Sequence, residues 1–120
     1  MVGPDSATVN GLYLPTDEIH NDEALYVKEE DSGTCIRYAK DKRWTVSDLY
    51  HKDANINGGF LKCAEKHLPD PTLAKVWKVD GKAQASVVVI HETSKQVRLF
   101  CLRCRCDESI GYANISLNFR

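Results

Sequence analysis

The chain has 120 residues and a mass of 13.5 kDa, a length that fits one domain with one hydrophobic core. Hydrophobic residues make up 42% of it and charged residues 28%, which excludes a fibrous or intrinsically disordered chain. No apolar run approaches the roughly 18 residues of a membrane-spanning helix, and the first residues lack the basic and apolar regions of a secretory signal. The sequence therefore predicts a cytoplasmic protein with no membrane contact.

Charge is distributed unevenly along the chain. Residues 1–31 carry eight acidic residues and one lysine, a net charge of −7, whereas residues 32–120 carry fifteen basic and nine acidic residues, a net charge of +6. The simpler interpretation is that the acidic segment packs beside a basic surface of the same fold; the alternative is a basic face open to an acidic partner. The pI near 6.4 is well below the value of about 9 that is typical of nucleic-acid-binding domains, so no nucleic-acid partner is expected.

Short apolar runs separated by turn-forming residues dominate the chain from residue 11 to about residue 102. The runs lie at residues 12–14, 25–28, 35–38, 44–49, 60–64, 76–79, 86–91 and 97–102. Most of the segments between them contain Gly, Asn, Asp or Pro, whose backbone preferences favour tight turns. Runs of this length and spacing predict an antiparallel β-rich domain.

Two pairs of runs predict tight hairpins, because apolar and polar residues alternate on both sides of a short turn. The first pair joins residues 36–38 to residues 44–48, and the second joins residues 76–79 to residues 85–90 through Asp80-Gly81. Successive strands are therefore expected to pair with each other.

Helices are expected to be scarce. The best candidate spans residues 61–68, where three apolar residues fall on one helical face before a proline ends the segment. Single helical turns are further candidates at residues 47–52 and at residues 71–75. The predicted fold is thus mostly β, a single small antiparallel β domain that forms a sandwich or a partly open barrel, with at most one or two short helices.

The composition changes towards the C-terminus. Arginine and cysteine crowd into residues 98–106, and a weakly patterned segment follows. We therefore expect the β-rich module to span residues 8–94. Residues 95–120 are expected to form an extra strand or a loosely attached tail.

Several short segments carry a resemblance to a known module. They are Val9-Asn10-Gly11-Leu12-Tyr13, Ala24-Leu25-Tyr26-Val27-Lys28, Ile36-Arg37-Tyr38, Arg43-Trp44-Thr45-Val46-Ser47, the stretch from Pro69 to Pro71, and Val76-Trp77-Lys78-Val79. With them, residues 9–90 resemble a small β-rich module of multidomain proteins from protists, particularly dinoflagellates and apicomplexans. The resemblance implies a module of uncertain function that stands beside other domains, and it carries over no catalytic residue. From about Lys95 the chain departs from that pattern.

The five cysteines offer one candidate metal site. Cys101, Cys104 and Cys106 would supply three thiolates to zinc, whose structural sites take four Cys or His ligands, with Cys63, His67 or His91 as the fourth. Strand alternation opposes this cluster, because it places Cys101 on the other face from Cys104 and Cys106. Incidental cysteines are the simpler interpretation, so no cofactor is expected and zinc is the alternative.

The other two cysteines, Cys35 and Cys63, are expected to be small buried hydrophobes in a reducing compartment. A catalytic Cys/His pair would need a histidine base within hydrogen-bond reach, and no spacing in the sequence indicates one. The sequence also lacks the phosphate-binding, metalloprotease and serine-hydrolase motifs. A non-enzymatic protein is therefore favoured over an enzyme.

Recognition remains as the expected class of function. A β module can add an extended peptide to a strand edge, or it can present aromatic side chains such as Tyr13, Tyr26 and Trp44 to a ligand, although aromatic residues on strands are more often core. The predicted function is a non-enzymatic protein- or ligand-binding or scaffold module whose partner is a protein. The alternative is a small zinc-binding or thiol-active protein that uses Cys101, Cys104 and Cys106.

Overall fold

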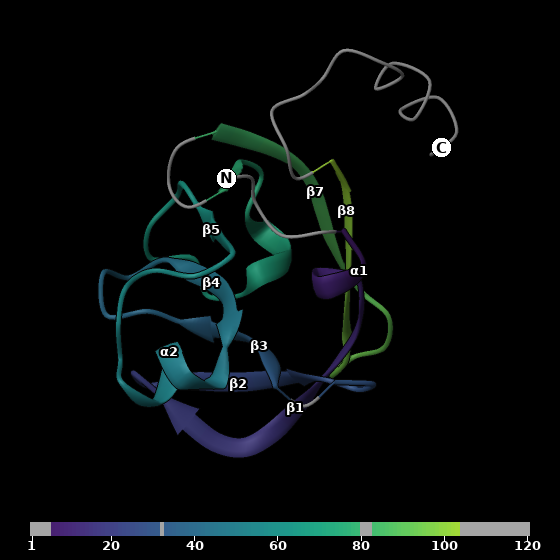
Figure 1. Ribbon diagram of the computed structural model, residues 1–120. Coiled ribbons are helices and arrows are strands. Elements are labelled where there is room, and N and C mark those ends of the chain that lie inside the picture. Colours follow the sequence, from purple (N-terminus) through teal and green to yellow (C-terminus); the bar gives the residue numbers. More distant parts are fainter. Residues whose placement is uncertain (1–5, 32, 80–82, 104–120) are drawn as a thin grey trace.

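A computed structural model describes residues 6–31, 33–79 and 83–103, and it confirms the predicted mostly β fold (Figure 1). One sheet of eight antiparallel strands closes into a barrel. The strands are β1 (Gly11–His20), β2 (Glu23–Lys28), β3 (Thr34–Tyr38), β4 (Trp44–Asp48), β5 (Leu61–Cys63), β6 (Trp77–Val79), β7 (Ala83–His91) and β8 (Val97–Arg103). The helical elements are α1 (Ser6–Val9), α2 (Leu49–Asp53) and a 3-10 turn, η1 (Pro71–Leu73).

Each strand pairs with the strand that follows it, so the barrel is an up-and-down meander. Residues 11–13 of β1 pair with residues 97–99 of β8 and close the sheet. The sequence predicted a sandwich or a partly open barrel, and the structure is a fully closed one. Closure depends on a contact between the two ends of the domain, which no local pattern contains.

Both predicted hairpins are present. In the first, Tyr38 pairs with Trp44 across a turn in which Lys42 has a φ of 72°. In the second, Val79 pairs with Ala83, on either side of residues that lie outside the described part of the chain. Alternation of apolar and polar residues therefore identified both the strands and their partners.

The helix predicted over residues 61–68 is wrong. Residues 61–63 form β5, which pairs with β4 on one side and with β6 on the other. Leu61 and Cys63 are both buried while Lys62 is half-buried, the period-two pattern of a strand. The ladder satisfies the backbone of β5 and buries these two side chains together, which outweighs the helical spacing of the apolar residues.

The two predicted helical turns are confirmed, and an aspartate caps each one. The Asp48 carboxylate accepts a hydrogen bond from the backbone N–H of His51 at 2.8 Å at the start of α2, and Asp70 accepts one from Thr72 at 2.8 Å at the start of η1. Such caps satisfy backbone N–H groups that have no partner within the turn.

The barrel interior holds the hydrophobic core. Its buried members are Val9, Tyr13, Ile36, Tyr38, Trp44, Val46, Leu61, Cys63, Ala74, Trp77, Ala85, Val87, Val89, Val97, Leu99 and Cys101. Alternate residues of each strand face this interior, and the intervening residues face outward. The outer side of the barrel is therefore where charged and exposed side chains are placed.

The segment 95–120 is described only in part. Residues 97–103 form β8, which pairs with both β7 and β1, and residues 104–120 lie outside the described part. Within the residues described, no helix is long and apolar enough to cross a membrane.

Candidate functional site

The aromatic residues predicted to bind a ligand belong to the barrel interior. Tyr13 is fully buried and its hydroxyl donates to the Val9 carbonyl oxygen at 2.6 Å. Trp44 is 1% exposed and its indole N–H donates to the Leu68 carbonyl oxygen at 2.8 Å. Tyr26 is partly buried and lies edge-on to Trp44, with 6.3 Å between ring centroids. Contacts within the fold thus account for Tyr13 and Trp44, and a surface ligand would not reach them.

The predicted cysteine cluster falls mostly outside the described residues. Cys104 and Cys106 lie there, while Cys101 is 1% exposed and disulfide-bonded. Among described residues, no group of three or more metal-binding side chains is found. The fourth-ligand candidates are separated: the Cys63 thiol donates to the Glu65 carbonyl oxygen, and His91 pairs with Asp70 at 3.2 Å.

Cys35 and Cys63 are buried free thiols, as expected for small hydrophobic side chains. Burial raises the pKa of both thiols, and hydrogen bonds offset this only in part. A raised pKa keeps a cysteine in its protonated, weakly nucleophilic form. Neither residue therefore has the environment of a reactive thiol.

The strand edge available for peptide addition is poorly suited to it. β1 pairs with β8 only over residues 11–13, so its second half runs on beyond β8. That half begins with Pro15, which has no N–H to donate. The register of β1 against β2 also shifts between Pro15 and Ile19. Asp17 and Glu18 lie within the shift. Proline, a bulge and charge are the features with which proteins protect a strand edge from pairing.

One outer wall of the barrel carries apolar side chains. On β7, Val88 and Ile90 are 41% and 42% exposed, while Val87 and Val89, which alternate with them, face the core. Phe100 pairs with Val88, and Arg98 pairs with Ile90. Leu12 of β1 pairs with Arg98 from the other side. We call the outward side chains of these five residues the apolar wall.

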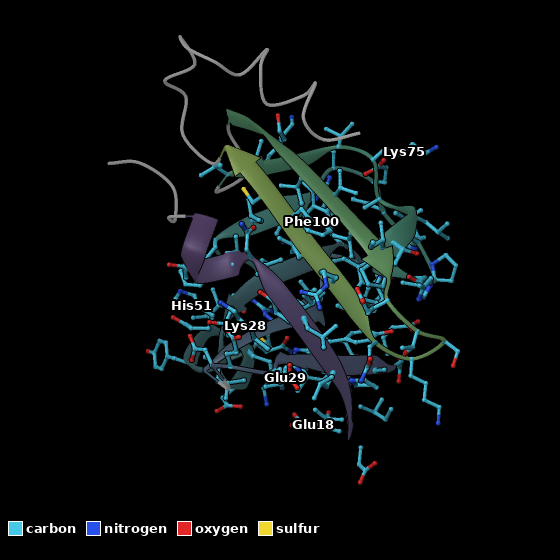
Figure 2. All side chains as sticks on the ribbon, turned by 90° about the vertical axis from the view of Figure 1, so that its right-hand side faces the viewer. Glu18, Lys28, Glu29, His51, Lys75 and Phe100 are labelled. Carbon is cyan, nitrogen blue, oxygen red and sulfur yellow. The ribbon has the colours of Figure 1, made fainter. Side chains whose placement is uncertain are left out.

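Figure 2 looks onto this wall, with Phe100 near its centre. Within the described residues, no helix lies across it, although α1 lies beside β8. α2 instead contacts β3 and β4, on the other side of the barrel (Figure 1). The two outer walls therefore differ: one is covered by a helix and its loop, and the other presents apolar side chains.

The covered wall is polar and tightly packed. Its outward residues Cys35, Arg37, Thr45 and Ser47 are all fully buried beneath α2 and the loop that follows it. Gly59 makes this approach close, because a Cβ there would lie 2.7 Å from the Val46 carbonyl oxygen.

One feature of the sequence indicates the apolar wall, although the prediction of strands did not make use of it. Residues 87–90 are Val-Val-Val-Ile, so apolar residues occupy both faces of β7 rather than one. A strand with water on its outer face alternates between apolar and polar residues. The uninterrupted run therefore marks an outer face that is apolar as well.

The chain was compared with protein-family models, curated proteins and solved structures. None of the three comparisons finds a match.

Proposed function

We propose that the chain is a non-enzymatic protein-binding module and that the apolar wall is its contact surface. The observation that carries the proposal is the exposure of Val88 and Ile90 at alternate positions of one strand. Their pairing partners Phe100 and Arg98 extend the surface across β8. Contiguous exposed apolar side chains with polar residues around them are typical of protein interaction sites.

The chemistry of the wall defines the partner. Arg98 lies between Ile90 and Leu12 in the register, and its Nε donates to Glu92 at 2.8 Å. A guanidinium among apolar side chains is a common anchor in interfaces, where it pairs with a carboxylate. The partner is thus a protein segment with two or three apolar side chains and one carboxylate. The resemblance to protist modules that stand beside other domains agrees with such a role.

The test uses a random peptide library displayed on phage and selected against the full chain. We expect enriched peptides to combine apolar residues with Asp or Glu. Val88→Lys and Ile90→Lys should weaken binding of a selected peptide by at least about tenfold, since each places an ammonium in an apolar contact.

Ile56→Lys is the matched control. Ile56 has the same 41% exposure as Val88 but lies in the loop after α2, and its replacement should leave the affinity unchanged. Near-UV circular dichroism verifies the fold of each variant. A library without enriched peptides, or peptides that respond to Ile56→Lys and not to Ile90→Lys, would overturn the proposal.

A further inference from the structure

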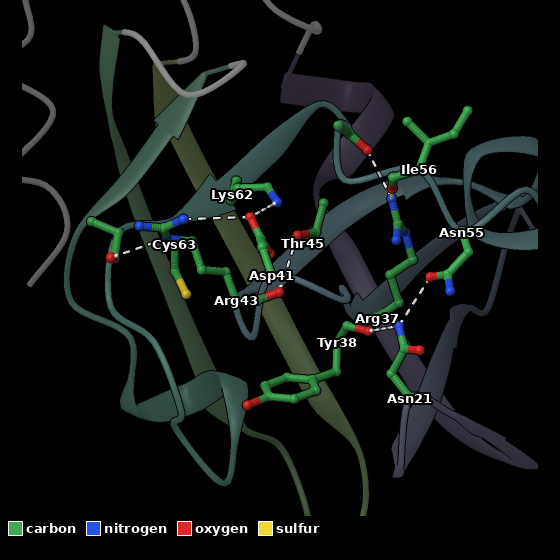
Figure 3. Close-up of polar contacts among 12 residues, drawn as sticks. Asn21, Arg37, Tyr38, Asp41, Arg43, Thr45, Asn55, Ile56, Lys62 and Cys63 are labelled. Atoms are coloured by element: carbon green, nitrogen blue, oxygen red, sulfur yellow. Dashed lines mark hydrogen bonds and ion pairs between the residues drawn. The ribbon is translucent and has the colours of Figure 1, made fainter.

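Arg37 is a buried cation at the centre of the covered wall. It is 0% exposed, and its Nε donates to the Ser47 hydroxyl at 2.8 Å. Its Nη2 donates to the carbonyl oxygens of Ile56 and Gly58. Figure 3 shows the side chain extending towards Ile56. Two of the three guanidinium nitrogen atoms thus donate to three uncharged oxygen atoms.

The third nitrogen, Nη1, is buried and has no hydrogen-bond partner in the described part of the chain. No carboxylate in that part lies within ion-pair distance of Arg37. The carboxylates that act on its charge are occupied elsewhere: Asp41 binds Lys62 at 2.6 Å, and Asp48 binds His51 at 2.7 Å. A buried charge without a counter-ion is unfavourable, so a compensating anion would stabilise this arrangement.

A second buried donor lies in the same region. His20 Nε2 is buried and has no partner among the described residues. Burial lowers the pKa of His20, and the charges of Arg37 and Lys52 lower it further. A lowered pKa keeps the imidazole neutral near pH 7, so one of its ring nitrogen atoms carries a proton that it can donate.

The backbone around both residues is held in place. Asn21, which follows His20, donates to the Tyr38 carbonyl oxygen at 2.9 Å and to the Asn55 side-chain oxygen at 3.0 Å (Figure 3). Tyr38 follows Arg37, and Asn55 precedes Ile56. The β1–β2 turn, which directly follows His20, is thereby held against the loop that encloses Arg37.

The other cation of the region already has its counter-ions. Lys52 is 7% exposed, and its ammonium binds Glu18 at 2.7 Å and Asp53 at 2.6 Å. The charge of Lys52 is therefore compensated within the fold, whereas the charge of Arg37 has no counter-ion among the described residues. One positive charge of this region is thus left without an anion in the part of the chain that the structure describes.

We propose that Arg37 Nη1 and His20 Nε2 bind one small monovalent anion of the size of chloride beneath the loop of residues 54–58. The donors are N–H groups of a guanidinium and a neutral imidazole, which bind halides by hydrogen bonding. Both nitrogen atoms are shielded from solvent, and Arg37 supplies one positive charge, so we expect a small, singly charged ion rather than a divalent oxyanion.

The direct test is a crystal of the full chain grown in sodium bromide. Anomalous diffraction locates bromide without ambiguity. We expect an anomalous peak within hydrogen-bond distance of both Arg37 Nη1 and His20 Nε2. A peak of ordinary density without anomalous signal would identify a water molecule and overturn the proposal.

A solution experiment separates binding from crystal conditions. Sodium gluconate is replaced stepwise by sodium chloride at constant ionic strength, and the Tm is recorded. We expect a saturable rise, about 5 °C at a chloride concentration ten times its Kd. A chloride response that is absent, linear or reproduced by sulfate contradicts a specific site.

Two variants assign the response to these residues. Arg37→Met should abolish it; because this variant also loses three hydrogen bonds and could fail to fold, His20→Leu is the second test. His20→Leu keeps Arg37 in place and should weaken chloride binding about tenfold, the loss of one hydrogen bond to a charged group. His91→Leu, on the other side of the barrel, should leave the response unchanged. An unchanged response in His20→Leu would exclude the imidazole as a ligand and overturn the proposed pair.

Discussion

The indole N–H of Trp44 donates to the carbonyl oxygen of Leu68 at 2.8 Å, across 24 positions of the sequence. Trp44 begins β4 and is 1% exposed, whereas Leu68 lies in the irregular segment between β5 and η1. The bond therefore fastens that segment to the barrel. The same segment is held by the bond from the His67 N–H to the Lys42 carbonyl oxygen at 2.9 Å.

Trp44→Phe should destabilise the protein and loosen this segment. The change removes the donor, leaves the Leu68 carbonyl without its partner and removes part of a buried ring, so we expect a loss of at least about 1–3 kcal/mol in the free energy of unfolding. Urea denaturation measures the loss, and hydrogen exchange should accelerate at residues 64–70. Tyr26→Phe, which keeps the ring beside Trp44, should change stability by less than about 0.5 kcal/mol. A loss in Trp44→Phe as small as that in Tyr26→Phe, or unchanged exchange at residues 64–70, would contradict this prediction.

Gly59→Ala should destabilise the covered wall. A Cβ at Gly59 would lie 2.7 Å from the Val46 carbonyl oxygen and 2.9 Å from the Ser47 Cβ, so backbone must move. We expect a cost of about 1–3 kcal/mol, typical of overpacking. Gly58→Ala is the control, since a Cβ there meets nothing within 4 Å, and should be neutral within about 0.5 kcal/mol. Thermal unfolding of both variants makes the comparison, and a neutral Gly59→Ala would show that the loop adjusts freely.

Ser47→Ala should also be costly. The Ser47 hydroxyl accepts from Arg37 Nε at 2.8 Å, and its removal leaves another N–H of a buried cation without a partner. We expect a loss of about 1–3 kcal/mol. Ser86→Ala makes the same chemical change at an exposed position of β7 and should alter stability by less than about 0.5 kcal/mol. Equilibrium denaturation in urea distinguishes the two; similar values would show that water replaces the serine at Arg37.

Stability should fall as the pH is lowered from about 7.5 to 5.5. Burial, reinforced by Arg37 and Lys52, lowers the pKa of His20 below its ordinary value of 6.5. As the pH falls through 6.5, the unfolded chain therefore takes up the proton before the folded chain does, and proton uptake favours unfolding until the folded-state pKa is passed. Urea unfolding measured across this range should show a shallower slope for His20→Asn than for the unchanged protein. An identical slope would place the responsible group elsewhere.

A second loss of stability is expected near and below pH 4, from a carboxyl group whose pKa is also lower in the folded chain than in the unfolded chain. Burial raises the pKa of Asp41, but hydrogen bonds and ion pairs with Lys62 and Arg43 outweigh it, so the net shift is downward. The unfolded chain then binds this proton first as the pH falls through 3.8, the ordinary value. Asp41→Asn should reduce the loss in acid, as followed by circular dichroism in an acid titration.

Local patterns were sufficient for most strands, for both hairpins and for the two helical turns. Alternation identified β3 and β4 together with their pairing, and α2 and η1 lie where single turns were expected, although their aspartate caps were not predicted. The helix expected over residues 61–68 failed because a short apolar segment satisfies both periods. Pairing with β4 and β6, which lie elsewhere in the sequence, decided between them.

The sequence by itself determined that this protein is a small antiparallel β domain, because period-two burial and turn chemistry act between residues that are neighbours in the chain. Only the tertiary structure decided that the sheet closes, that Tyr13 and Trp44 lie inside it, and that Arg37 is buried without a carboxylate among the described residues. The same alternation that predicts a strand does not say which of its faces becomes the interior. Closure of β1 on β8 makes that choice, because it encloses one face of every strand; the other faces form the outer walls, of which one is covered by α2 and another presents apolar side chains.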